Sequence, residues 1–223
     1  MKQHLNENSI CFITCVNDDT LYDLCLRHIQ SLSVPPHMEV ELIDIRKADS
    51  MASGYQAAMH QSDAKYKVYV HQDTFIINRS FIYDILHVFQ QNDALGMIGV
   101  IGAEDVPQSG IWWEASKKAG KVIEYRSTYS YLSFDEIDGT VKTVEALDGL
   151  LLATQYDLPW RKEIFDGWHF YDTSQCFEFR KKGYLVGIPH QKEPWVIHAC
   201  GNEFDSDQYS DYLNKFLSEY FKT

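Results

Sequence analysis

The residues His71, Gln72 and Asp73 place an imidazole and a carboxylate directly after an apolar segment, residues 66–70. Side chains at the carboxyl end of a buried strand face the crevice where open α/β sheets bind their ligands. There Asp73 would hold a divalent ion, and His71, one strand period away, would face the same side. Two alternatives stay open: Asp73 caps a helix near residues 74–79 or closes a turn, and His71 packs as a polar residue at the strand end.

The segment 165–173 is rich in aromatic residues and carries two carboxylates, Asp166 and Asp172. Sugar rings stack on aromatic faces, and a carboxylate within hydrogen-bond reach can take the proton of a hydroxyl group. Asp172 is the preferred candidate for such a general base, and Asp166 is the second. The alternative is that Asp172 only begins a helix, because residues 172–175 match a capping-box pattern.

A third candidate, His198, ends the short apolar segment 195–198 ahead of a turn at Gly201. An imidazole at this point could be a further ligand of the ion at Asp73 or could contact a phosphate group. A histidine after a strand can equally be a structural residue with its hydrogen bonds satisfied.

The elements that must position these residues follow from apolar runs and helical spacings. The predicted strands are residues 10–16, 40–45, 66–71, 97–101, 184–188 and 195–198. The predicted helices are residues 21–32, capped by Asp18 or Asp19, residues 55–60 and 81–89, one opening near Asp172, and residues 206–221. The early alternation of strands and helices predicts parallel pairing with right-handed crossovers in a single α/β domain, residues 1–223. Residues 110–134 are predicted to form loops and hairpin strands.

Composition narrows the range of partners. The net charge of −12 leaves no basic stripe for a phosphate backbone, so nucleic acid and anionic membranes are excluded as partners. An acidic protein that binds an anionic ligand needs a metal ion or a local basic cluster. The longest apolar run, residues 94–103, is too short to span a bilayer, and residues 1–19 do not match a signal peptide, so we expect a cytoplasmic location. The scattered cysteines are expected to be reduced thiols of the core.

The order of these features resembles the GT-A glycosyltransferases, and most closely the bacterial glycosyltransferase-like branch related to streptomycin-biosynthesis proteins. The resemblance covers residues 10–201 and rests on their sequence order. The features that carry it are the strand at 10–16 with Asn17, Asp44, the segment 52–58 with Gly54 and Tyr55, residues 71–73, Asp148 and Gly149, the segment 165–172, and His198.

The resemblance implies a Rossmann-like, mostly parallel central sheet flanked by helices. It implies a nucleotide-diphospho-sugar donor over residues 8–103, an acceptor hydroxyl approaching residues 104–205, and a C-terminal helix at 206–223. In donor binding it implicates Asn17, Asp44, Gly54, Tyr55 and His71, with Asn17 and Asp44 near the nucleoside.

For the chemistry, the resemblance implies a divalent cation, Mn²⁺ or Mg²⁺, at Asp73 and His198, and Asp172 as the base of a single inverting displacement. The chain departs from the family pattern twice. His71 stands where an acidic residue is usual, and Tyr171 stands where glutamate is common.

Two other functions compete with a glycosyltransferase. One is a GT-A-like domain that binds a nucleotide or glycan without turning it over, and donor consumption separates this function from catalysis. The other is a nucleotidyltransferase, which we rank last, because such enzymes carry a glycine-rich basic loop after the first strand, whereas residues 15–19 are acidic and lack glycine.

Overall fold

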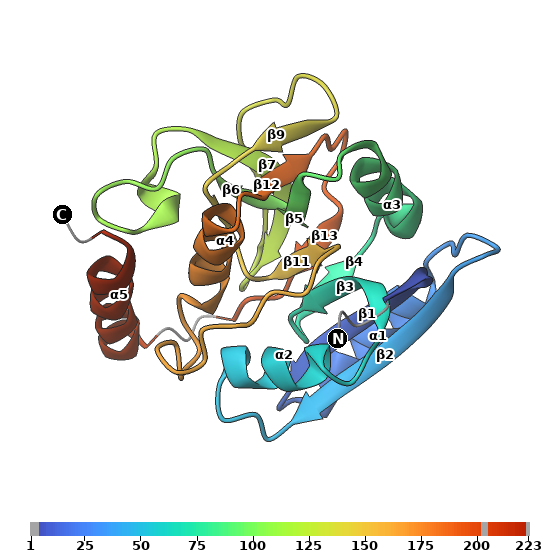
Figure 1. Ribbon diagram of the computed structural model, residues 1–223, viewed down its shortest axis with the longest axis horizontal. Helices are drawn as coiled ribbons and strands as arrows, with labels where there is room; N and C mark the ends of the chain where they lie inside the picture. Colours follow the sequence, from blue (N-terminus) through green and yellow to red (C-terminus); the bar gives the residue numbers. More distant parts are fainter. Residues whose placement is uncertain (1–4, 202–204, 222–223) are drawn as a thin grey trace.

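The computed structural model describes residues 5–201 and 205–221, and over these residues the chain folds into two sheets with helices on both faces (Figure 1). The larger sheet has the strand order β2-β1-β3-β11-β5-β12-β9. These strands are β1 (Asn6–Val16), β2 (Glu39–Arg46), β3 (Ala64–Val70), β5 (Leu95–Gly99), β9 (Val141–Thr143), β11 (Leu151–Thr154) and β12 (Leu185–Pro189).

The parallel pairing predicted for the first strands is confirmed, since β1 pairs in parallel with both β2 and β3. The strand β11 lies antiparallel between β3 and β5, while β5 and β12 are again parallel. The sheet is therefore mixed, and β11 connects a parallel N-terminal unit to a second parallel pair.

The smaller sheet has the order β10-β6-β7-β13-β4, with β8 paired to β7. Its strands are β4 (Thr74–Ile76), β6 (Ile101–Ala103), β7 (Lys118–Tyr125), β8 (Tyr129–Ser133), β10 (Ala146–Leu147) and β13 (Val196–His198). The hairpin of β7 and β8 and a 3₁₀ turn, η1 (Trp112–Glu114), agree with the loops and hairpin strands predicted over 110–134.

One alternative and one prediction were wrong. Residues 74–76 form the strand β4 instead of a helix, so Asp73 is not a helix cap. It lies in a turn, as the other half of that alternative has it, and the Thr74 N–H donates a hydrogen bond to the His71 carbonyl oxygen across this turn. The segment 97–101, predicted as one strand, is divided at Val100 between β5 and β6. A continuous apolar run does not show where a chain passes from one sheet to another, because every residue in it is buried either way.

Three of the helices begin where a side chain accepts a hydrogen bond from a free backbone N–H group. The carboxylate of Asp18 accepts hydrogen bonds from the N–H groups of Thr20 and Leu21 and caps α1 (Asp19–Gln30). Helix α2 (Met51–Met59) starts earlier than predicted, because Ser50 and Ser53 form a reciprocal capping box. The remaining helices are α3 (Phe81–Gln91), α4 (Tyr171–Lys181) and α5 (Ser206–Tyr220).

The core lies on both faces of the larger sheet. Alternate residues of β1 point to opposite sides: Phe12 packs with α1 and α3, whereas Ile13 packs with α2 and α4. Burial on both faces explains why β1 is a continuous apolar run. In Figure 1, α5 lies at the edge of the molecule beside α4, where Phe216 stacks on Phe170. The larger sheet is packed on both faces, and the ends of its strands position the polar residues described next.

Candidate active site

The residues His71, Asp73 and His198 meet where two sheets end. His71 follows β3, Asp73 lies in the turn between β3 and β4, and His198 ends β13. Antiparallel pairing sets Thr74 of β4 opposite His198, and the Ala199 N–H donates a hydrogen bond to the Asp73 carbonyl oxygen at 2.8 Å. Backbone pairing therefore holds two distant segments of the chain in one site.

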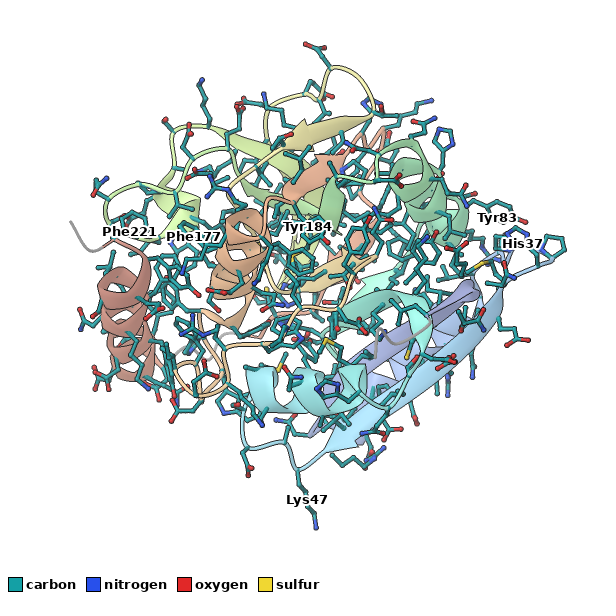
Figure 2. All side chains as sticks on the ribbon, viewed as in Figure 1. His37, Lys47, Tyr83, Phe177, Tyr184 and Phe221 are labelled. Atoms are coloured by element: carbon teal, nitrogen blue, oxygen red, sulfur yellow. The ribbon has the colours of Figure 1, made fainter. Side chains whose placement is uncertain are left out.

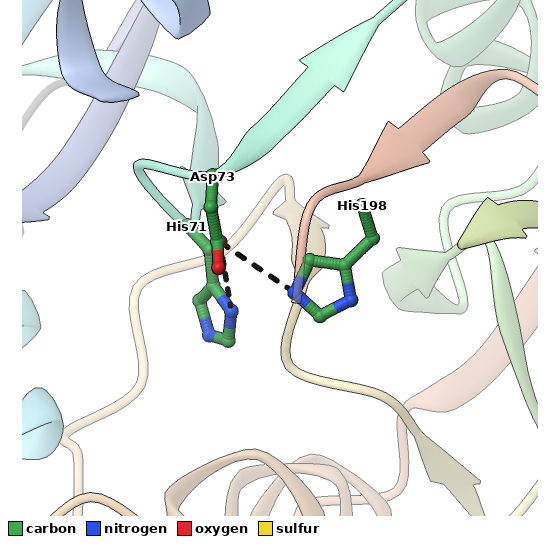
Figure 3. Close-up of side chains that lie close together, drawn as sticks. All are labelled: His71, Asp73 and His198. Atoms are coloured by element: carbon green, nitrogen blue, oxygen red, sulfur yellow. Dashed lines mark ion pairs between the residues drawn. The ribbon is translucent and has the colours of Figure 1, made fainter. Parts of the chain in front are cut away.

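Asp73 lies between the two imidazoles (Figure 3). Its Oδ1 is 3.5 Å from Nε2 of His198 and 3.9 Å from Nδ1 of His71. One ligand atom from each of the three side chains lies within 4.8 Å of the others. Two imidazole nitrogens and one carboxylate oxygen at this spacing fit a divalent cation.

Charge and burial act together on these three groups. Burial alone would raise the pKa of Asp73, but the neighbouring His198 and His71 lower it below its ordinary value. Burial lowers the pKa of His71, which favours the neutral imidazole. Burial also opposes the charged form of His198, yet the contact with Asp73 outweighs it and raises the pKa of His198 to about 10. Without a cation, Asp73 and His198 therefore form an ion pair.

Asp172 lies in the first turn of α4, beside the loop that contains Asp148 and Gly149. Its carboxylate accepts hydrogen bonds from the N–H groups of Gly149, at 2.9 Å, and Thr173, at 2.7 Å. The helix begins at Tyr171 after Phe170, so Asp172 is not the N-cap residue that the capping-box pattern suggested. Phe170 has a φ of 60°, a conformation uncommon outside glycine.

Burial, followed by repulsion from the nearby Asp148, raises the pKa of Asp172 to about 7. A general base works best when its pKa lies near the operating pH, because it is then deprotonated and still takes up a proton readily. Asp172 has this property.

Replacing Asp148 by asparagine is expected to lower the pKa of Asp172. The substitution removes a like charge, while burial, the larger cause, keeps the pKa above its ordinary value of 3.8. The midpoint can be followed by the ¹³C chemical shift of the Asp172 carboxyl group, which should titrate near pH 7 in the parent protein and at lower pH in the variant. An exposed control, Asp166→Asn, should leave the midpoint unchanged. An equal midpoint in Asp148→Asn would contradict the repulsion.

The two departures from the family pattern contact each other. Nε2 of His71 forms a hydrogen bond with the hydroxyl group of Tyr171. Tyr171 is only 4% exposed, and its ring packs against Tyr55 and Trp160. The two departures are therefore in direct contact, and Tyr171, which precedes Asp172 in the chain, connects the histidine pair to that carboxylate.

A cavity of about 300 Å³, the Lys47 cavity, opens beside Asp73 on the side of β1 and β2. Its lining comprises Cys15, Val16, Asn17, Ile45, Lys47, Ala48, Met51, His71, Gln72, Asp73 and Trp168. The side chain of Gln72 accepts hydrogen bonds from the N–H groups of Asn17 and Asp18 and donates one to Asn17. Lys47 follows β2 and extends outward from the molecule (Figure 2), so the cavity has a cation at its rim.

A second cavity of about 150 Å³, the Tyr209 cavity, lies on the side of α4 and α5. Its lining comprises His71, Trp112, Trp113, Asp148, Gly149, Trp168, His169, Phe170, Tyr171, Asp172, Thr173 and Tyr209. Trp113 and Trp168 are 44% and 42% exposed, so part of each indole ring is accessible from solvent. The two cavities share His71 and Trp168, so ligands in both would meet at these residues.

Four predicted site residues do not join this group. Asp166 is exposed and accepts hydrogen bonds from Lys215, at 2.7 Å, and from Tyr212, at 3.0 Å. Asp44 is bound by Arg46 at 2.8 Å, outside the lining of the Lys47 cavity.

The other two, Gly54 and Tyr55, lie within α2. A Cβ atom at Gly54 would meet Sγ of Cys15 at 2.5 Å, so the glycine permits close packing of α2 on β1. Tyr55 is fully buried in the aromatic core with Tyr69 and Trp160.

Several residues of the two cavities were not identified as site residues from the sequence. Lys47 lies in a loop and Trp113 in the short 3₁₀ turn η1, where only their residue type is a signal. Trp168 belongs to the aromatic segment 165–173, which the sequence associates with sugar stacking without singling out this residue. The sequence signal at Asp148 is stronger, because this residue begins an Asp-Gly turn within an apolar segment. A carboxylate in that position has a turn to stabilise or a ligand to bind.

The mixed sheet with helices on both faces, and the cavity at the carboxyl end of its parallel strands, agree with the GT-A fold of glycosyltransferases, and the comparison with solved structures shows this fold. Solved structures of this class superimpose on nearly the whole chain. S. aureus TarS in complex with UDP has a TM-score of 0.59 at 8% identity, covering 96% of this chain and 72% of TarS. The mannosyltransferase PcManGT from Pyrobaculum calidifontis, in complex with GDP-Man and Mn²⁺, has a TM-score of 0.61 at 10% identity. The match covers 97% of this chain and 64% of PcManGT.

The chain belongs to the glycosyltransferase-like family, whose model matches residues 11–220. It is also similar to the streptomycin biosynthesis protein StrF of Streptomyces griseus, with 27% identity over 143 residues. That match covers 62% of this chain and 47% of StrF, so the chain spans about half the length of this curated relative. Within the described residues, none of the helices has the length and apolar character needed to cross a membrane.

Proposed function

We propose that this chain transfers a sugar from a nucleotide-diphospho-sugar to the hydroxyl group of an acceptor, with inversion and with a divalent cation. One observation carries the proposal: Asp172, a carboxyl group with its pKa near 7, lines one of two cavities that meet at His71. A single displacement needs a base on one side of the reacting sugar carbon and a leaving-group site on the other, and two adjoining cavities can provide both.

The Lys47 cavity is assigned to the donor. Asn17 and Gln72 line this cavity with amide groups and are assigned to the nucleoside. Lys47 and His71 also line it and are assigned to the diphosphate. The complexes of TarS with UDP and of PcManGT with GDP-Man and Mn²⁺ support this assignment by fold. A cation at Asp73 and His198, when bound, would stabilise the negative charge that develops on the diphosphate.

The Tyr209 cavity is assigned to the acceptor. Trp113 and Trp168 are partly exposed aromatic residues of its lining and are assigned to stacking on a sugar ring. Asp172 is the group that takes the proton from the attacking hydroxyl. The Gly149 and Thr173 N–H groups hold the carboxylate in a fixed orientation. The opposite placement of base and donor leads to inversion at the sugar carbon.

Thermal unfolding with a panel of nucleoside diphosphates, each with and without a divalent cation, tests the donor assignment. A ligand at 100 times its Kd stabilises the folded state by about 2.7 kcal/mol. For a chain of this size, each kcal/mol raises Tm by about 2–4 °C. We expect cation-dependent stabilisation by one base and little by the others. No response to any diphosphate would contradict the proposal.

Catalysis is separated from mere binding by donor consumption. With the stabilising nucleotide identified, its sugar conjugates should release nucleoside diphosphate when a hydroxyl acceptor is present, and slow hydrolysis is expected without one. Binding of a nucleotide sugar with no release under either condition would instead identify a non-catalytic binding domain. Analysis of the product by NMR reports the configuration of the new bond.

A further inference from the structure

We propose that His71 is itself a metal ligand, and that His71, Asp73 and His198 together select a first-row transition-metal ion over Mg²⁺. The inference rests on the proposed function in one respect, since it takes this ion to be the one that assists the donor diphosphate. It concerns the position where the family pattern has an acidic residue and this chain has histidine.

The orientation of the rings supports a three-ligand set. His71 directs Nδ1, and His198 directs Nε2, toward the same oxygen atom, Oδ1 of Asp73. The ring centroids of the two histidines are 5.7 Å apart, with the planes inclined by 57°. The ion pair with Asp73 accounts for the direction of His198. The direction of His71 is additional, and it brings three ligand atoms within 4.8 Å of one another, close enough to share one cation.

Tyr171 acts as a positioning residue for His71. Its hydroxyl group contacts Nε2, the nitrogen on the far side of the ring from Asp73. When Nε2 carries the proton and donates it to this hydroxyl oxygen, Nδ1 keeps a free lone pair directed at the site. Histidine ligands of metals typically donate their second ring N–H in this way, which fixes both tautomer and ring orientation.

The donor atoms determine which ion is preferred. Mg²⁺ is a hard cation that takes oxygen ligands and retains its water molecules. Imidazole nitrogens suit transition-metal ions, and two histidines with one carboxylate form the set that binds Fe²⁺ in many non-haem sites. Replacing a carboxylate by His71 also removes one negative charge, which weakens the site for Mg²⁺ most. The remaining coordination positions would be filled by water or diphosphate oxygens.

Calorimetry of the protein with Mn²⁺, Co²⁺ and Mg²⁺ in turn, each together with the nucleoside diphosphate that stabilises the protein, tests this preference. We expect affinity to rise from Mg²⁺ through Mn²⁺ to Co²⁺, in the order that nitrogen-containing sites follow. His71→Asp restores the usual acidic residue. In this variant the affinities for Mn²⁺ and Co²⁺ should exceed the affinity for Mg²⁺ by less than in the parent protein, or should fall below it. Tyr171→Phe keeps the ring but removes the hydroxyl group, and should weaken Mn²⁺ and Co²⁺ binding by about 10–100-fold.

Pulsed electron paramagnetic resonance of the bound Mn²⁺ reports the ligands independently of activity. The parent protein should show couplings to two imidazole nitrogens, and His71→Asp should show one. A thermal melt of each variant shows whether it is folded. If His71→Asp does not fold, the loss of metal affinity in Tyr171→Phe still tests the inference. A single nitrogen coupling in the parent protein, or equal affinities for Mg²⁺ and Mn²⁺, would overturn the inference.

These outcomes separate the inference from the proposed function. Nucleotide-sugar turnover supported equally by Mg²⁺ and Mn²⁺, and unchanged in its metal preference by His71→Asp, would leave the function standing and overturn the role of His71. Two nitrogen couplings without any nucleotide binding, measured with Mn²⁺ alone, would support the metal site and count against the proposed transferase.

Discussion

Asp172→Asn is expected to bind the donor as the parent protein does and to turn it over about 10²–10⁴-fold more slowly, the usual loss for a missing general base. Asparagine has nearly the shape of aspartate, and its side-chain oxygen can still accept the hydrogen bond from the Gly149 N–H. It cannot take the proton of the acceptor hydroxyl. Donor affinity from calorimetry and product formation at saturating donor measure the two quantities separately.

The matched control is Asp166→Asn, which removes the second carboxylate of the same aromatic segment. Asp166 pairs with Lys215 on α5, so this substitution should cost little turnover. The Lys215 ion pair is exposed, and exposed pairs contribute only about 0–1 kcal/mol to stability. Near-normal turnover in Asp172→Asn together with a large loss in Asp166→Asn would move the role of base to Asp166.

The fold was predictable where periodicity is local. The amphipathic residues of α1 and α3 and the alternation of strands and helices from β1 to β3 indicate their structures directly. The place of β11 was not predictable, because it pairs antiparallel with β3 and β5 through contacts between segments far apart in the chain. A fully buried apolar segment carries no alternation that would indicate its neighbours.

The candidate site shows the same limit at the level of single residues. His71, Asp73 and His198 follow apolar strands, and their positions at strand ends identify them as site candidates. The distinction between Asp166 and Asp172 depends on α5, whose Lys215 binds one carboxylate, and on Asp148, which raises the pKa of the other. Neither Lys215 nor Asp148 is close in sequence to the carboxylate that it affects. Residue type and spacing can therefore make Asp172 the preferred base, but they cannot show that the two carboxylates have different environments.

The contact between His71 and Tyr171 changes the meaning of the two departures from the family pattern. Taken one at a time, each removes an acidic residue and argues for a weaker or inactive site. Their hydrogen bond makes them one local unit, in which a buried phenol orients an imidazole toward Asp73. This arrangement is compatible with the metal site proposed above, and Asp73 is the one carboxylate among the three grouped residues.

For that reason Asp73→Asn is expected to abolish the cation-dependent part of donor binding. Asparagine keeps the size of the side chain, but its neutral amide replaces the charged oxygen that both imidazoles face. Two histidines without a carboxylate hold a divalent cation poorly beside a diphosphate, so calorimetry should give the same weak donor affinity with and without metal. Asp23→Asn, an exposed substitution on α1, is the matched control and should keep the full metal dependence. Unchanged metal-dependent affinity in Asp73→Asn would place the ion elsewhere in the protein.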